Sequence, residues 1–175
     1  MIDLGPLHAA TRDLHHAVEQ TAFGQAMASG QVSEQAWTDW LQALRVLHMR
    51  VDPFAAPVLR RADEVMEDIV EMHGRGFRPR LLLSPQRFVD QANDEQFCLG
   101  AVYVLGGAHV MGGALIAKRV AGRLPTAHLV YNDGDRREAV AAVKALRDRN
   151  ELAAAARACF SVLIDIGNEI EARGL

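Results

Sequence analysis

Apolar residues recur along most of this chain with the period of an α-helix. Near the N-terminus Leu7, Ala10, Leu14 and Val18 follow one another at intervals of three and four residues, which places them on one helical face. A second such run, with two tryptophans and several leucines, covers residues 37–51. The sequence contains no convincing run of alternating β-branched residues. We therefore predict an all-α fold, a bundle of amphipathic helices.

Capping and helix-breaking residues divide these runs into separate helices. Gly30 is expected to end a short helix that starts near Phe23, and Ser33 is expected to cap the next helix. Further helices are predicted over 58–73, over 136–149 and over 151–172, with a turn at 131–135. Another helix is expected after Ser84 as its N-cap, with Pro85 as its first residue, and Asp94 and Glu95 are expected to open an apolar helix that runs to about 120. We expect six to eight helices in a single domain that spans residues 1–175.

Composition and charge exclude several classes of protein. The formal net charge of −3 gives no support for a nucleic-acid partner or for binding to an acidic membrane surface. The two cysteines, Cys98 and Cys159, argue against a disulfide scaffold, a zinc ribbon and an iron–sulfur cluster. They suit a reducing compartment, and residues 1–16 lack the pattern of a signal peptide. We therefore expect a cytoplasmic protein.

One segment, residues 97–117, is apolar enough to raise the question of a membrane span. Its flanks carry few aromatic and basic anchors, and it has no glycine pair at GxxxG spacing. The rest of the chain also needs a central element. We predict a buried core helix and no membrane partner.

Four polar residues near the N-terminus are candidates for chemistry because they share a helical face. His8, Arg12, His15 and Glu19 follow one another at spacings of four, three and four. An imidazole at the edge of a core can reach a metal in a crevice while a carboxylate binds its other nitrogen. An arginine one turn away can pair with an anionic group of the same ligand. From spacing alone, an ordinary solvated face is the alternative.

Glycines inside the apolar helix are a second candidate feature. Gly106, Gly107, Gly112 and Gly113 lie within eight residues, and each costs a helix about 1 kcal/mol relative to alanine. They allow the backbone to approach a flat ligand, or a local kink. Tight helix packing or a loop is the alternative interpretation.

Other motifs give weak support for a ligand site or are absent from the sequence. Lys144 and Arg147 are three residues apart and are candidates for binding ligand carboxylates, although such pairs are usually only solvated. The sequence has no nucleotide-binding glycine motif, no HExxH and no ExxH. The missing ExxH argues against a carboxylate-bridged di-iron site.

Residues 7–15, LHAATRDLH, resemble the N-terminal helix of the haem oxygenase family, in which an L-x-x-A-T-[basic]-x-x-H run ends on the proximal iron ligand. His15 stands at that ligand position. The entry to the helix after Ser33, the glycine-rich segment 103–113 and the last two helices are similar to other parts of this family. The resemblance spans nearly the whole chain and implies the haem oxygenase fold.

The resemblance also implies a function. Family members bind haem b as both cofactor and substrate, and use O₂ and electrons from a ferredoxin or flavin reductase to release biliverdin, CO and ferrous iron. His15 would ligate the iron, and the other cofactor contacts would be Arg12, Glu19, Gly113, Lys144 and Arg147. The catalytic wall on the opposite, distal side would consist of Gly106, Gly107, His109 and Gly112.

The distal segment departs from the family pattern in three ways. The interval from Gly106 or Gly107 to Gly112 is longer by one or two residues, which indicates an insertion or different winding such as a π-bulge. The acidic residue usual near the first glycine is missing, and His109 is unusual there. His109 would supply a polar contact or a second axial ligand. A non-catalytic haem or tetrapyrrole carrier or sensor of the same fold is therefore the alternative function, and a non-haem iron oxygenase is a third.

Overall fold

The computed structural model describes residues 5–175, so the first four residues of the predicted domain lie outside the described part. Within that part all regular structure is helical, as predicted, and no strand is present. The α-helices are α1 (Pro6–Gln20), α2 (Ala22–Ser29), α3 (Glu34–Val51), α4 (Ala62–Gly74), α5 (Ser84–Gln91), α6 (Glu95–Gly107), α7 (Gly113–Val120), α8 (Asp133–Arg147) and α9 (Ala153–Glu171).

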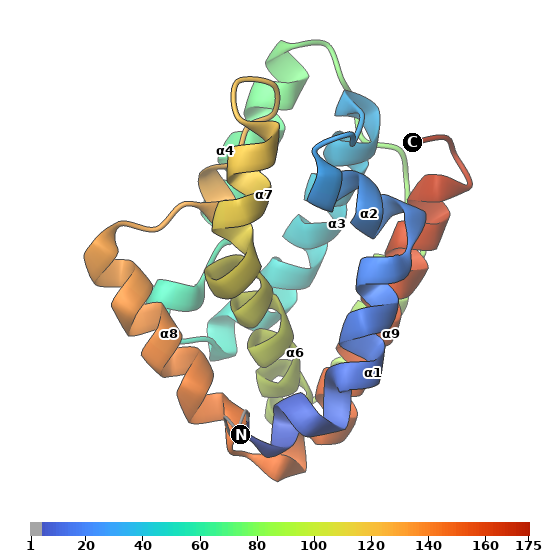
Figure 1. The fold of residues 1–175 in the computed structure, drawn as a ribbon. Helices are drawn as coiled ribbons and strands as arrows, with labels where there is room; N and C mark the ends of the chain where they lie inside the picture. The colour runs from blue at the N-terminus through green and yellow to red at the C-terminus, as the bar shows by residue number, and fades with distance from the viewer. Residues whose placement is uncertain (1–4) are drawn as a thin grey trace.

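The C-terminal helix α9 organises the bundle. Helices α1 and α6 both pack along it, and α2, α3 and α5 also contact it. Figure 1 shows α1 and α9 on one side of α6 and α8 on the other side. α8 contacts both α1 and α6 at one end, while α2 bridges α1 and α7 at the other. Within residues 5–175, α1 has no comparable packing on α6 or α7.

Side-chain caps fix several helix boundaries where the sequence predicts them. The Ser33 hydroxyl accepts a hydrogen bond from Ala36 N at 3.2 Å, and Asp94 accepts one from Phe97 N at 2.7 Å. These bonds satisfy backbone N–H groups that have no partner inside the helix. Gly30 ends α2 with a φ of 74°, a left-handed conformation that favours glycine.

Two predicted helix boundaries are wrong: the helix start at residue 58 and the turn at 131–135 before the next-to-last helix. The helix predicted to begin at 58 starts only at Ala62, because Pro57–Leu59 form a separate 3₁₀ turn, η2. The predicted turn at 131–135 contains the start of α8. Asn132 accepts a hydrogen bond from Asp135 N at 2.9 Å and therefore caps a helix where a turn was expected.

The cap predicted at Ser84 is also shifted. Ser84 is the first residue of α5, and its hydroxyl donates to Glu169 Oε1 at 2.9 Å instead of accepting from its own helix. The side chain therefore ties α5 to α9.

α6 and α7 are joined without a break by a π-helical turn, η3 (Ala108–Gly112). In this turn Gly113 N donates to Ala108 O, five residues earlier. The altered winding predicted from the glycine spacing is thus confirmed. Because these three segments form one rod, the described residues make eight separate helical rods, within the predicted range.

The rod Glu95–Val120 is 26 residues long and, by length and composition alone, apolar enough to cross a membrane. Half of its most apolar window is buried inside the protein, against α9, α8 and α3. The rod is therefore a half-buried core helix, as the sequence predicts.

Candidate functional site

The polar face predicted on α1 is present and open to solvent. The side chains of His15 and Glu19 are each 58 % exposed, and Arg12 is exposed one turn earlier. His15 Nδ1 lies 3.6 Å from Glu19 Oε1. Thr11, between these residues in sequence, is buried and donates its hydroxyl to Leu7 O at 2.8 Å. The helix thus presents the histidine outward and keeps the threonine in the core.

The His15 ring is oriented by two neighbours. On one side Phe160 of α9 meets it edge-on, with ring centroids 5.7 Å apart and planes at 76°. On the other side Glu19 Oε1 lies 3.6 Å from Nδ1, which is close enough for electrostatic attraction but too far for a hydrogen bond. His15 Nε2 has no hydrogen bond to any described residue. Nε2 is therefore free to bind an external ligand.

An open hollow on the protein surface follows α1. Its lining includes His8, Arg12 and His15, and Arg157 of α9 closes its other side. Arg157 donates to both carboxylate oxygens of Asp13, at 2.7 and 2.9 Å, and lowers the Asp13 pKa to about 2. This ion pair ties α1 to α9. Arg12 forms no ion pair within residues 5–175, so its charge remains available to a ligand.

Arg147 lies at the start of α1. A Cβ atom added at Gly5 would stand only 2.8 Å from its Cγ, so the two residues are in close contact. Burial raises the pKa of the Tyr103 hydroxyl, and the nearby charge of Arg147 opposes this rise. Arg147 therefore sits where α1, α6 and α8 converge. His15 lies ten residues after Gly5, which is about 15 Å farther along α1 at the rise of an α-helix. Lys144 is exposed and lies one turn before Arg147 on α8.

The rod α6–η3–α7 carries an exposed apolar strip. Met111 is 69 % exposed and Leu115 is 56 % exposed, and Ala108 is also exposed. A Cβ added at Gly112 would meet nothing within 4 Å. Such a strip on an otherwise half-buried helix is a surface suited to an apolar ligand.

The four glycines of the rod serve different purposes. Cβ atoms added at Gly106 and Gly113 would stand 3.3 Å from Leu59 and Leu129 respectively, so these two glycines allow tight packing. Gly107 and Gly112 are partly exposed and have little or nothing near them. Tight helix packing therefore explains Gly106 and Gly113, whereas Gly107 and Gly112 leave the backbone open to a close approach by a ligand.

These residues fit a haem group. The free Nε2 of His15 is a suitable axial nitrogen for iron. The exposed strip around Met111 and Leu115 matches a flat apolar macrocycle, and the free Arg12 matches its carboxylates.

His109 is not part of the exposed strip. Its side chain is 5 % exposed and stacks on His48 of α3, with ring centroids 5.1 Å apart and planes at 22°. The edge of the same ring meets His128, at 5.5 Å between centroids. The histidine that the sequence singles out is therefore the middle member of a buried row of three imidazoles.

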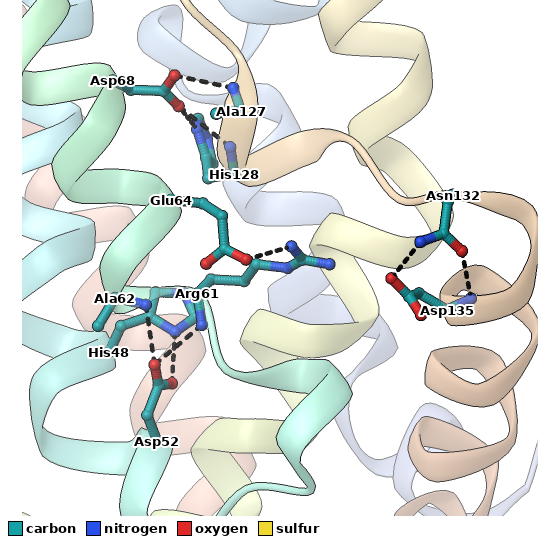
Figure 2. A network of polar contacts seen from close by, with 10 residues as sticks. All are labelled: His48, Asp52, Arg61, Ala62, Glu64, Asp68, Ala127, His128, Asn132 and Asp135. Carbon is teal, nitrogen blue, oxygen red and sulfur yellow. Dashed lines mark hydrogen bonds and ion pairs between the residues drawn. The ribbon is translucent and has the colours of Figure 1, made fainter.

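Two carboxylates hold the outer members of this row (Figure 2). Asp52 Oδ1 lies 2.8 Å from His48 Nδ1, while its Oδ2 accepts hydrogen bonds from the backbone N of Arg61 and Ala62, both at 2.9 Å. Asp52 thereby also anchors the start of α4.

Asp68 of α4 binds His128 in the same manner. Its Oδ2 accepts from His128 Nδ1 and His128 N, and its Oδ1 accepts from Ala127 N at 2.8 Å. Asp68 is 1 % exposed and His128 is fully buried. The pair joins α4 to the 3₁₀ turn η4 (Ala127–Leu129).

Burial controls the charge of two of these imidazoles, His109 and His128. It lowers the pKa of His109 well below the ordinary value, and the positive potential from His48, His128 and Arg61 lowers it further. Burial also lowers the pKa of His128, although Asp68 opposes the shift. Both rings are therefore neutral near pH 7. No three or more metal-binding side chains within residues 5–175 converge closely enough to hold a metal ion.

Apart from His109, the sequence did not indicate this row. Acidic residues surround Asp68 in the sequence, yet its carboxylate is buried. The spacing of four residues between His48 and Asp52 would have indicated one pair. Nothing local indicates the other pair, since Asp68 and His128 are 60 residues apart.

Comparisons with known proteins bear on the fold. The sequence matches no protein-family model and no curated protein. Solved structures do match over most of the chain, at 16–17 % sequence identity.

Three of these structures are haem oxygenases. The enzyme from Leptospira interrogans matches with a TM-score of 0.79 and 16 % identity, over 93 % of this chain and 97 % of that one. Haem oxygenase-2 from the cyanobacterium Synechocystis, in complex with haem and NO, matches with a TM-score of 0.77 and 17 % identity, over 95 % of this chain and 84 % of that one. Haem oxygenase-1 from Synechocystis, in complex with haem, matches with a TM-score of 0.75 and 16 % identity, over 95 % of this chain and 91 % of that one. The chain therefore has the haem oxygenase fold.

Proposed function

We propose that this protein binds haem through His15 and opens the ring with O₂ to give biliverdin, CO and ferrous iron. The observation that carries the proposal is the exposed His15 imidazole, oriented by Glu19 and Phe160 and free at Nε2. The fold is shared with haem oxygenases, two of which are seen as haem complexes.

In this proposal His15 binds iron through Nε2. Glu19, with Oε1 3.6 Å from Nδ1, would favour the tautomer that carries its hydrogen on Nδ1 and a lone pair on Nε2. Phe160 restricts rotation of the imidazole. The two neighbours therefore prepare the ligand nitrogen before haem arrives.

The apolar strip of the rod would hold the macrocycle of bound haem. Met111 and Leu115 supply apolar contact, and Gly112 leaves room for the backbone of η3 to approach the ring closely. Arg12 and Lys144, both exposed, pair with the carboxylates at the edge of the haem. Covering the strip also excludes water from the reacting face.

Bound haem supplies the iron that binds O₂ and the ring carbon that is oxidised. Electrons come from an external donor, either a ferredoxin or a flavin reductase. The side chains of this protein hold the haem and exclude water.

A second candidate function is haem or tetrapyrrole transport or sensing without turnover. The observation that favours it is the absence of any aspartate or glutamate from residues 96–120 of the rod. No carboxylate on this wall is then available to order water for proton transfer.

A spectroscopic experiment separates the two. Haem is added to the purified protein, the visible spectrum is recorded, and reductant and air are then supplied. Loss of the haem band with the appearance of a biliverdin band supports ring opening, and a stable haem spectrum supports the carrier. Absence of any haem band contradicts both.

A further inference from the structure

Met111 differs from the other residues of the apolar strip because its side chain carries an atom that can bind a metal. It is 69 % exposed at the π-helical turn, between exposed Ala108 and Leu115 at spacings of three and four residues. A methionine sulfur binds haem iron in some haem proteins, as the partner of an axial histidine. The side chain is unbranched and flexible, so its sulfur can adjust to a ligand.

His109, the second axial ligand that the sequence brought into consideration, faces the core from the same turn. Its ring lies between two other buried imidazoles, at 5.1 and 5.5 Å between centroids, and its side chain is 5 % exposed. To reach a ligand on the strip, it would have to leave both rings. The other nitrogen donors among residues 106–120, Lys118 and Arg119, are cations in the last turn of α7. Met111 is therefore the one neutral, exposed donor in this part of the rod.

His15 and Met111 lie at similar levels of the bundle. Arg147 contacts Gly5 at the start of α1, and its charge acts on Tyr103 of α6. These contacts mark one common end. His15 is about 15 Å from Gly5 along α1, and Met111 is about 12 Å from Tyr103 along the rod. Figure 1 shows α1 and the rod both running from this end toward α2 and α7, which contact each other.

Neighbouring helices hold α1 and the rod apart. α8 contacts both of them at one end, and α2 joins α1 to α7 at the other, while α1 and η3 show no comparable packing on each other within residues 5–175. The imidazole of His15 and the thioether of Met111 thus stand exposed on two separated elements. This arrangement suits an iron that takes one axial ligand from each element.

The wall around Met111 offers little to a water molecule on the iron. Ala108, Gly112 and Leu115 have no polar side-chain atom, and residues 96–120 contain no aspartate or glutamate. Water there would find few hydrogen-bond partners. A thioether needs none, and covering it removes exposed apolar surface from water. The sulfur is therefore favoured over water at this position.

We propose that Met111 binds the haem iron through Sδ, on the face opposite His15. The inference rests on the proposed haem binding and assigns a residue to its second axial position. A sulfur lone pair forms the bond, so no electron is transferred, and no proton is released because the thioether is neutral. An external ligand such as O₂ or CO must displace the sulfur. A strong bond would therefore favour the carrier function, and a weak one would permit ring opening.

The first test is the visible spectrum of the ferric haem complex. The wild-type protein should be low-spin and six-coordinate, with the weak far-red band of an iron–methionine bond. Met111→Leu keeps a similar apolar shape but removes the sulfur, so the band should disappear and a water-ligated, high-spin spectrum should replace it. Only this variant should change its spectrum from neutral to alkaline pH, because iron-bound water can lose a proton and a thioether cannot.

Met49→Leu is the matched control, since Met49 is a 56 % exposed methionine on α3. It should leave the spectrum of the haem complex unchanged. Methionine ligation raises the reduction potential of haem, so Met111→Leu should lower the potential and Met49→Leu should not. With the closed form in about tenfold excess, ferrous Met111→Leu should bind CO about tenfold more tightly than the wild type.

The outcomes separate this inference from the proposed function. Absence of any haem band overturns both. A wild-type complex that matches Met111→Leu in spectrum, potential and CO affinity overturns the role of Met111 alone and leaves binding through His15 intact. A low-spin spectrum that survives in Met111→Leu but is lost in His109→Phe would show that the buried imidazole leaves the core to bind iron, which also overturns the assignment.

Discussion

The exposed histidine of α1 and the buried histidines behind η3 use the same side chain in opposite ways. His15 is more than half exposed, and its carboxylate neighbour stands 3.6 Å away, so the ring is oriented but its Nε2 is free. His48 and His128 are almost completely buried, and each is held closely by an aspartate. Exposure thus leaves a histidine available to an external ligand, whereas burial with a carboxylate gives it a structural role and a fixed tautomer.

The comparison also shows why sequence position alone does not reveal the role of a histidine. His15 and His48 both lie four residues before an acidic residue on a helix, Glu19 and Asp52 respectively. Burial makes the difference, because an unpaired polar group in the core costs far more than one in water. The following predictions test each side of this contrast.

The largest effect is expected from removing a buried carboxylate. Asp68→Ala leaves His128 and two backbone N–H groups without their acceptor, which should lower the free energy of unfolding by about 3–5 kcal/mol. Urea denaturation of the haem-free protein measures this value. Glu67→Ala, an exposed change on the same helix, should alter it by no more than about 0.5 kcal/mol. Equal effects of the two variants would show that the buried pair has no special importance.

The next largest effect concerns the exposed histidine. His15→Ala should weaken haem binding about a hundredfold, roughly 2.7 kcal/mol, and abolish the spectral signature of an axial imidazole. Stability without haem should hardly change, because the side chain is exposed. His16→Ala is the matched control, since His16 is 72 % exposed and lies 3.8 Å from the same glutamate. If His16→Ala removes the signature and His15→Ala does not, the ligand assignment is wrong.

A third prediction concerns pH. Because the folded-state pKa values of His109 and His128 lie below the unfolded value of 6.5, the unfolded chain binds more protons just below pH 6.5. Stability is therefore full above pH 6.5 and falls as the pH decreases toward the folded-state values, by at most about 1.4 kcal/mol per pH unit for each histidine. Urea unfolding between pH 7 and 5 measures the slope. His109→Phe should reduce the slope, and an unchanged slope would contradict the assignment.

The smallest effects are expected from substitutions of the open Gly112 and the closely packed Gly113. Gly112→Ala should weaken haem binding about tenfold, about 1.4 kcal/mol, because the methyl group occupies the exposed wall. The haem-free protein should lose no stability, since the new Cβ meets nothing within 4 Å. Gly113→Ala instead brings a Cβ to 3.3 Å from Leu129 and should destabilise the fold. Haem titrations and urea unfolding of both variants check this reversal of effects.

The sequence predicted the elements that depend on local signals. The helical face of His15, the cap at Ser33, the helix start at Asp94 and Glu95, and the altered winding between Gly106 and Gly113 all follow from residue types at short spacing, and the structure confirms them. Asn132 was misassigned because the same residue type begins turns and caps helices.

The buried row could not be predicted in the same way. Asp68 meets His128 only because α4 packs against η4, and His109 meets His48 only because the rod crosses α3. In the sequence these residues are polar positions in separate segments, with no motif that links them. Only the packing of the helices reveals that they share one buried site.

The π-helical turn determines which face of the rod α6–η3–α7 points toward the core. A residue added to a regular α-helix rotates everything after it by about 100°, which would turn the buried face of α7 toward solvent. At η3 the additional residue is contained in one wide turn, where Gly113 bonds back to Ala108. Gly106 before the turn and Gly113 after it therefore both keep their faces against the core. The turn accommodates the additional residue while the two ends of the rod remain in register with the rest of the bundle.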